Sequence, residues 1–198
     1  MVSDWYINFL SRNEGGWNPD PNEPGGAANR GVTAMTWGNL APQLFGIPGN
    51  MQTLAAMTDR QWIDIVRWHW KTATNNGKVN SSVIQEYLTE LLWWFGNVKA
   101  AQQAAKDLGY TIDVDGVNGN KTTAVLNEIG YKGRTGELLD RIYANQTATF
   151  RSWGGYGQYG QGWENRSKEL YQYLKKKATY HFSISGKVIN ITYYYLFA

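Results

Sequence analysis

Residues 14–33 read Glu-Gly-Gly-Trp-Asn-Pro-Asp-Pro-Asn-Glu-Pro-Gly-Gly-Ala-Ala-Asn-Arg-Gly-Val-Thr, a glycine- and proline-rich loop that carries three carboxylates. The residues before it place apolar side chains at helical spacing, with Ser3 or Asp4 available as N-cap. Because glycine accepts the left-handed conformation in which helices commonly end, we expect Gly15-Gly16 to end this helix. Glu14 would then lie in its last turn, where the negative end of the helix macrodipole disfavours an ionised carboxylate.

A carboxyl group that is kept partly neutral near neutral pH can serve as a general acid. Glu14 is therefore a candidate catalytic residue. From its position alone, an ordinary surface glutamate before a glycine turn is an equal alternative.

The stretch resembles the opening motif of the glycoside hydrolase family 108 N-acetylmuramidases. These are peptidoglycan hydrolases that include phage endolysins and proteins labelled secretion activators. The family pattern, roughly E-G-G-Y-x-N-D-P-x-D-P-G-G-x-T-x-x-G-I-T, is matched at both Gly-Gly pairs, the prolines, Gly31 and Val32-Thr33. The resemblance implies a mainly α, lysozyme-like helical fold of two lobes. It also implies cleavage of the β-1,4 bond between MurNAc and GlcNAc, with no cofactor and no metal.

Two positions depart from the family pattern. Glu23 stands where the family usually has Asp, and Ala28 stands where it has Thr. In the related phage lysozymes an Asp and a Thr hold the attacking water. Glu23 keeps the charge but is longer by a methylene, and Ala28 cannot hold a water, although Asn29 or Thr33 could.

Hydrolysis needs an acid at the leaving oxygen and either a water held by a base or a nucleophilic carboxylate. Glu14 is the expected acid, Glu23 the preferred partner by alignment, and Asp20 the alternative partner. A separation of about 6.5 to 9.5 Å between the two carboxyl groups predicts inversion, and about 5 to 5.5 Å predicts retention. Without a useful partner, Glu14 alone suggests a lytic transglycosylase. A non-catalytic peptidoglycan-binding or export-assisting protein is the remaining alternative, supported by Glu23 and Ala28.

Aromatic and glycine residues around this motif fit a glycan-binding cleft. Sugar rings pack their C–H faces on aromatic planes, and loop glycines let the backbone approach the glycan. Packing in the core is the competing interpretation for the tryptophans. The candidate substrate-binding residues are Trp17, Gly25, Gly26, Asn29, Thr33 and Trp37.

Later motifs organise the second half. Asp115, Gly116, Gly119 and Thr122 match the D-G-x-x-G-x-x-T turn of predicted peptidoglycan-binding domains, where the turn joins two helices and the Thr caps the second. A structural turn, with Asp115 bonded to nearby amides, is favoured over direct contact with a ligand. We expect a catalytic lobe at 1–96, a helical peptidoglycan-binding-like lobe at 97–178 and a C-terminal β-hairpin at 179–198.

Further helix signals are specific enough to test. Thr33 can cap a helix that ends at Gly46, and Thr58 to Gln61 and Ser82 to Gln85 each read as a capping box. Glu90 could face the cleft as a third carboxylate, but a brace to the backbone or to an arginine is favoured. Residues 154–162 read as a loop, with the last helix opening at Trp163.

Composition limits the partners. A net charge of +3 suits an anionic cell-wall polymer but is too small to indicate nucleic acid. The longest apolar run, 91–95, is too short for a bilayer, so we expect no stable membrane insertion. No signal peptide is visible. We therefore expect a protein made in the cytoplasm that reaches the cell wall through a holin or by non-classical release. The pattern leaves the oligomeric state open.

Overall fold

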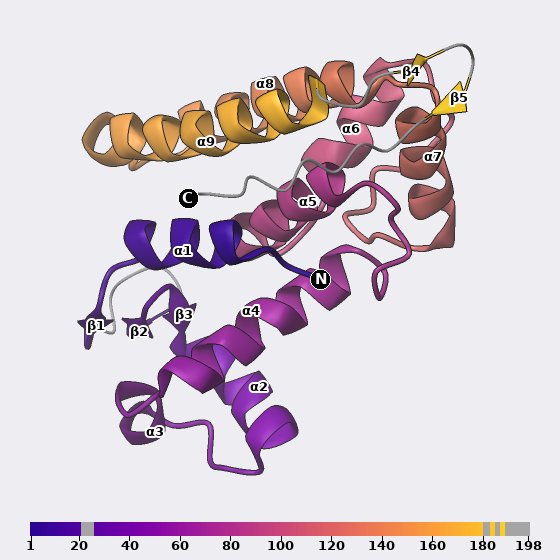
Figure 1. Cartoon of the computed structure of the whole chain (residues 1–198). Coiled ribbons are helices and arrows are strands. Elements are labelled where there is room, and N and C mark those ends of the chain that lie inside the picture. The colour runs from indigo at the N-terminus through magenta and orange to yellow at the C-terminus, as the bar shows by residue number, and fades with distance from the viewer. Residues whose placement is uncertain (21–25, 180–182, 185–186, 189–198) are drawn as a thin grey trace, which may run out of the picture. The chain divides into compact units, whose positions relative to one another are not determined.

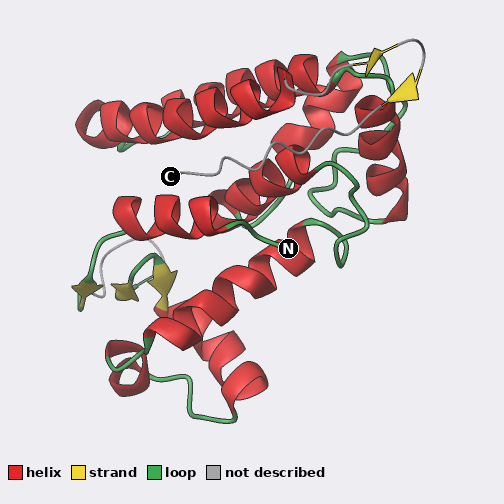
Figure 2. Cartoon of the chain, viewed as in Figure 1, coloured by secondary structure: helices red, strands yellow, loops and turns green. Residues whose placement is uncertain are grey.

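The computed structural model describes residues 1–20, 26–179, 183–184 and 187–188. Helices dominate, as Figure 2 shows, so the predicted mainly α class is confirmed. The chain divides into two compact units, residues 1–71 (unit 1) and 72–198 (unit 2), which are described separately below. The lobe boundary expected after Gly96 falls inside unit 2, and the assignment of roles to lobes stays a prediction.

Unit 1 combines helices with a small antiparallel sheet, and its last helix runs past the boundary by two residues (Figure 1). Its elements are α1 (Asp4–Asn13), β1 (Trp17–Asn18), β2 (Ala28–Asn29), β3 (Val32–Thr33), α2 (Ala34–Phe45), α3 (Met51–Ala55) and α4 (Asp59–Ala73).

The sheet has the strand order β1-β2-β3 and lies within the glycine-rich stretch that the sequence analysis treated as a loop. Trp17 pairs with Asn29, and Asn29 pairs in turn with Val32. The turn between β2 and β3 therefore has two residues, Arg30 and Gly31, with φ angles of 50° and 76°. Positive φ at both positions is the signature of a type I′ turn, whose twist matches that of the strands it joins.

The end of α1 differs from the expectation. Glu14 is the C-cap residue and has an extended backbone, with φ −89° and ψ 139°. Gly15 and Gly16 are not in the left-handed region. The reason is the direction of the chain, which leaves the helix to enter β1 instead of folding back over its last turn.

Helix signals downstream of the sheet are largely confirmed. The Thr33 hydroxyl caps α2 by accepting the Thr36 N–H at 3.2 Å, and Gly46 ends the helix with φ 66°. Thr58 and Gln61 exchange the two bonds of a capping box, at 2.9 and 3.3 Å.

Unit 2 is a set of helices followed by a short hairpin. Helix α8 packs on α9 along its length, as Figure 1 shows, and also packs on α6. The elements are α5 (Ser82–Phe95), α6 (Lys99–Asp107), α7 (Asn120–Tyr131), α8 (Thr135–Arg151), α9 (Tyr156–Thr179), β4 (Ser183–Ile184) and β5 (Lys187–Val188).

The second expected capping box is absent, and the N-cap of its helix lies one residue earlier than expected. Ser81, not Ser82, is the N-cap of α5 and accepts the Ile84 N–H at 3.4 Å. Gln85 does not complete a capping box, because its buried side-chain amide donates to the Val79 carbonyl at 2.5 Å. The Gln85 side chain is thus engaged with a residue six positions earlier, and Ser81 caps the helix without it.

The expected loop at 154–162 is mostly helix, because α9 begins at Tyr156. Each interior glycine costs a helix about 1 kcal/mol relative to alanine. Side-chain contacts offset that cost: the Tyr156 hydroxyl donates to Glu164 at 2.5 Å, and the Tyr159 ring stacks on Trp163. Gly160 is required for this packing, because a Cβ there would overlap the Tyr156 ring.

Glu90 braces unit 2 and is wholly buried. The Arg166 Nε donates to one of its oxygens at 3.0 Å, and the Arg166 guanidinium carbon lies 4.7 Å from the centroid of a Trp94 ring. The brace therefore replaces the alternative in which Glu90 faces a cleft as a third carboxylate. It ties α5 to α9.

The predicted C-terminal hairpin is present where the chain is described. Strands β4 and β5 are antiparallel, with Ser183 opposite Val188 and Ile184 opposite Lys187. The rest of the predicted hairpin, 180–182, 185–186 and 189–198, lies outside the described residues. None of the described helices has the length and apolar character needed to cross a membrane.

The Glu90–Arg166 pair predicts a large stability effect. Replacing Arg166 with methionine leaves a carboxylate buried without its cation, so we expect the free energy of unfolding to fall by about 3 to 5 kcal/mol in urea titrations. The control is Arg134→Met, because Arg134 pairs with Glu137 at the surface, where a pair contributes less than about 1 kcal/mol. Equal losses in the two variants would contradict the brace.

Candidate active site

Glu14 lies where α1 gives way to the sheet. Its backbone N–H donates to the Leu10 carbonyl at 2.8 Å, and the residue is half-buried. A Cβ added at Gly15 or Gly16 would meet no atom within 4 Å, so the backbone beside Glu14 is open. Trp17, in β1, is 40% exposed. A helix end, an open glycine pair and an exposed indole thus follow one another in unit 1.

The predicted second carboxylates are only partly described. Asp20 is exposed, and its backbone N–H donates to the Asn18 side-chain oxygen at 3.0 Å. Glu23 and Gly25 lie outside the described residues. Gly26 is described and has a φ of 75°, which favours glycine there.

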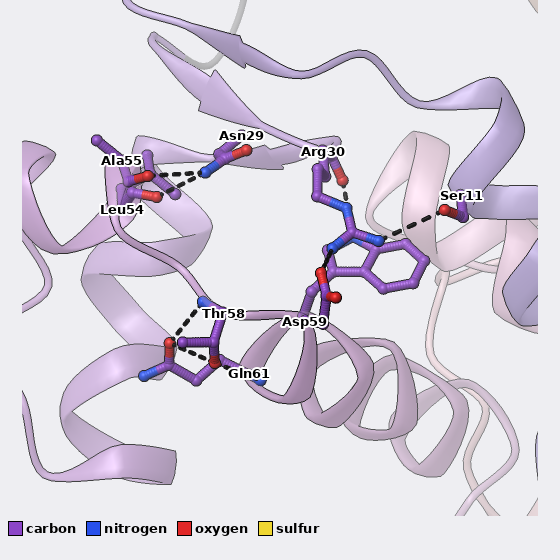
Figure 3. Close-up of polar contacts among 9 residues, drawn as sticks. Ser11, Asn29, Arg30, Leu54, Ala55, Thr58, Asp59 and Gln61 are labelled. Atoms are coloured by element: carbon purple, nitrogen blue, oxygen red, sulfur yellow. Dashed lines mark hydrogen bonds and ion pairs between the residues drawn. The ribbon is translucent and has the colours of Figure 1, made fainter.

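Ala28 lacks the hydroxyl of the family's Thr, and Asn29 and Thr33 are the residues expected to hold a water in its place. Both side chains bond to the backbone instead. Asn29 is buried, and its amide donates to the carbonyls of Leu54 at 2.9 Å and Ala55 at 3.4 Å, which fastens β2 to α3 (Figure 3). Thr33 caps α2. The sequence does not reveal the task of Asn29, because its partners lie 25 and 26 residues away, whereas the cap by Thr33 confirms the expectation.

Trp37 must be reassigned from the cleft to the core. Its side chain is fully buried, its Nε1 donates to Thr53 Oγ1 at 2.8 Å, and its ring lies 5.9 Å from that of Phe45. A residue with no exposed surface cannot offer a face to a sugar ring. Helical spacing in α2 turns Trp37 inward together with Leu40 and Ala41.

Arg30 is a residue of this region that the sequence analysis did not single out. Its guanidinium lies 4.2 Å from the centroid of a Trp62 ring, Nη1 pairs with Asp59 at 2.5 Å, and Nη2 donates to the Ser11 hydroxyl at 3.4 Å. Figure 3 shows Arg30 between Ser11 and Asp59. No local spacing could have revealed these contacts, because the partners are 19, 29 and 32 residues away.

The turn at Asp115, Gly116, Gly119 and Thr122 is held from within by Gln102, a wholly buried residue of α6. Its amide donates to Asp115 at 2.7 Å and to Thr122 Oγ1 at 3.1 Å, and its oxygen accepts the Gly116 N–H at 2.7 Å. Gly119, not Thr122, is the N-cap of α7, so the Thr capping role expected from the resemblance is wrong. The Thr122 hydroxyl is turned to Gln102 instead.

Unit 2 also contains a hollow of about 370 Å³, formed by the end of α5, α6 and α8, with Phe95, Lys99 and Asn145 among its walls. None of the predicted site residues lines it. Within the described residues, no group of three or more His, Asp or Glu side chains is placed to hold a metal ion.

The fold is similar to that of the solved structure of SagA of Brucella abortus. The two chains are 22% identical and superpose with a TM-score of 0.69 over 88% of this chain and 94% of that chain. This likeness supports the lysozyme-like fold class predicted from the sequence. Residues 7–96 match the family described as Glycosyl hydrolase 108. The search of curated proteins gives no match.

Two tryptophans of unit 1 should respond differently to truncation. Trp37→Ala empties a fully buried site and should lower the free energy of unfolding by about 3 to 5 kcal/mol. Trp17→Ala removes a partly exposed side chain and should cost less than about 1 kcal/mol. Chemical denaturation of both variants checks this, and a Trp17 loss as large as that of Trp37 would show that Trp17 belongs to the core.

Asp115 predicts a dependence of stability on acid. Hydrogen bonds from the Gln102 amide and the Val117 N–H hold the pKa of its carboxyl below the ordinary value. A lowered folded-state pKa contributes stability above the unfolded pKa of about 3.9, and that stability is lost as the pH falls through the folded-state pKa. Between about pH 5 and pH 2, Asp115→Asn should therefore lose less stability than the wild type. The exposed Asp113→Asn is the control, and identical acid profiles for wild type and Asp115→Asn would contradict the assignment.

Proposed function

We propose that this protein hydrolyses the β-1,4 bond between MurNAc and GlcNAc in peptidoglycan, with Glu14 as general acid. The observation that carries the proposal is the place of Glu14: it lies inside the segment that matches Glycosyl hydrolase 108, on a half-buried helix end beside an open glycine pair. The open glycine pair leaves room for a glycan to approach this end of α1, and the backbone of Glu14 is held by the helix.

The chemistry assigned to Glu14 is proton donation. As the bond between the MurNAc anomeric carbon and the glycosidic oxygen breaks, Glu14 gives its proton to that oxygen, which leaves as the GlcNAc hydroxyl. A water then supplies its oxygen to the anomeric carbon and its proton to a carboxylate, so that one water is consumed for each bond cleaved. Glu23 or Asp20 is the proposed second carboxylate. Trp17 is the proposed platform for a sugar face, because it remains exposed beside Glu14.

A lytic transglycosylase is the second candidate, and one observation favours it. Ala28 offers no hydroxyl, while Asn29 and Thr33 are engaged in holding α3 and α2. A site without a held water suits attack by the 6-hydroxyl of the same MurNAc residue, which yields a 1,6-anhydro end and consumes no water. A protein that binds the wall without cleaving it is the remaining candidate, supported by Glu23 and Ala28.

The proposed partner is the peptidoglycan glycan strand, and the net charge of +3 suits such an anionic polymer. Access to the wall by way of a holin or by non-classical release is part of the proposal.

Glu14→Gln tests the mechanism, because the change keeps the shape of the side chain and removes the acidic proton. Digestion of purified peptidoglycan sacculi should slow by about 10²- to 10⁴-fold, the usual contribution of a general acid. Mass spectrometry of the released fragments should show reducing MurNAc ends with the wild type. The matched control is Glu128→Gln, a surface glutamate of α7 paired with Lys132, which should digest sacculi as the wild type does.

The outcomes separate the candidates. Anhydro-MurNAc ends would assign the protein as a transglycosylase, and sacculi that are bound but not cleaved would assign it as a binding protein. A fully active Glu14→Gln variant would remove Glu14 from the mechanism. Glu23→Gln should slow digestion less than Glu14→Gln if Asp20 can take its place.

A further inference from the structure

Arg30 occupies a backbone position that arginine rarely takes. It is the first residue of the type I′ turn between β2 and β3, with a φ of 50°. Glycine and asparagine are preferred there, and a non-glycine residue in the left-handed region costs on the order of 1 to 3 kcal/mol. The other described non-glycine residues with positive φ are both asparagines, Asn75 and Asn76. A feature of the arginine side chain must therefore offset the backbone cost.

One set of Arg30 contacts fastens its side chain to α4. Its guanidinium lies over the Trp62 ring at 4.2 Å and pairs with Asp59 at 2.5 Å, while its backbone carbonyl accepts the Trp62 Nε1–H at 2.9 Å. Trp62 is almost fully buried, so it provides a fixed base. Stacking on the indole and pairing with a carboxylate together use the flat, forked shape of the guanidinium, which lysine lacks.

The other contacts of Arg30 reach the chain on both sides of Glu14. Nη2 donates to the Ser11 hydroxyl at 3.4 Å, one helical turn before Glu14. The Arg30 backbone N–H donates to the Gly16 carbonyl at 3.4 Å, two residues after it. Between these points Gly15 and Gly16 have open surroundings, in which a Cβ would meet nothing within 4 Å. Side-chain packing at these two glycines therefore does not fix the path of the chain, and the bonds to Arg30 supply a constraint there.

We propose that Arg30 is a positioning residue that relays the fixed position of the buried Trp62 to the segment carrying Glu14. This inference rests on the proposed function of Glu14 as the acid. Displacing a catalytic group by about 1 Å can slow a reaction on the order of 10²-fold. Loss of the Arg30 side chain therefore acts on the rate of the bound complex and much less on binding of the glycan.

Two substitutions separate the side chain from the turn. Arg30→Gly keeps the turn, because glycine adopts positive φ without strain. It also keeps the backbone bonds to Gly16 and Trp62, and it removes the side-chain contacts with Ser11, Asp59 and Trp62. Arg30→Lys keeps the charge but cannot form the fork. Arg67→Ala is the control: Arg67 also lies on the surface of unit 1, where it pairs with Asp64 within α4.

Initial rates on purified, solubilised glycan strands give the first readout. Arg30→Gly should lower kcat by about 10- to 100-fold and change KM by less than about threefold, because geometry and not binding is lost. Arg30→Lys should recover part of kcat, and Arg67→Ala should match the wild type. Wild-type kcat in Arg30→Gly would overturn the proposal, and so would a change confined to KM.

Hydrogen exchange gives a readout that does not depend on activity. The amides of Glu14 and of β1 should exchange about tenfold faster or more in Arg30→Gly than in the wild type, with no such change in Arg67→Ala. If the wild type releases nothing from peptidoglycan, the proposed function fails, and exchange still decides the positioning role. Unchanged protection of these amides in Arg30→Gly would overturn that role whatever the activity.

Discussion

Fastening of the turn between β2 and β3 to α4 is the constraint on which the candidate site depends. The buried Trp62 indole accepts the Arg30 guanidinium on its face and donates its own N–H to the Arg30 carbonyl. A two-strand ribbon of this length would be marginal alone in water. Because it is held on a buried side chain, it instead provides a fixed edge. Strand β1 pairs with that edge, and the open glycine pair connects β1 to Glu14.

Unit 2 contains two further contacts that hold distant segments together. A buried polar side chain from one helix satisfies groups on a segment far away in the sequence: Arg166 reaches Glu90 across 76 residues, and Gln102 reaches Gly116 across 14. Such groups are costly to bury unless every partner is in place, so each one selects a single arrangement of its neighbours. The glycine-rich start of α9 shows the same balance, with aromatic packing offsetting poor helix propensity.

The two halves of the proposed chemistry have unequal structural support. Glu14 stands where an acid is useful: its backbone is held, and the two glycines that follow it have open surroundings. The groups that would hold a water are less well provided, since Ala28 lacks a hydroxyl and the nearest polar alternatives hold backbone carbonyls and helix ends. This contrast is why hydrolysis and internal attack by a sugar hydroxyl are both serious candidates for one site.

The sequence by itself determined the mainly α class, the resemblance of residues 7–96 to Glycosyl hydrolase 108, most helix caps and the described part of the C-terminal hairpin. These features depend on near neighbours, because the spacing of apolar residues, the cap residues and the glycines that end helices all act within a few positions of the chain. The short strands of unit 1 and the burial of Trp37 were decided by the tertiary structure. Both depend on a side chain or strand brought close only by folding, and the tasks of Asn29 and Arg30 are invisible in the sequence for the same reason. The cap at Ser81 and the start of α9 at Tyr156 accompany side-chain contacts over four to eight residues that the sequence pattern did not reveal.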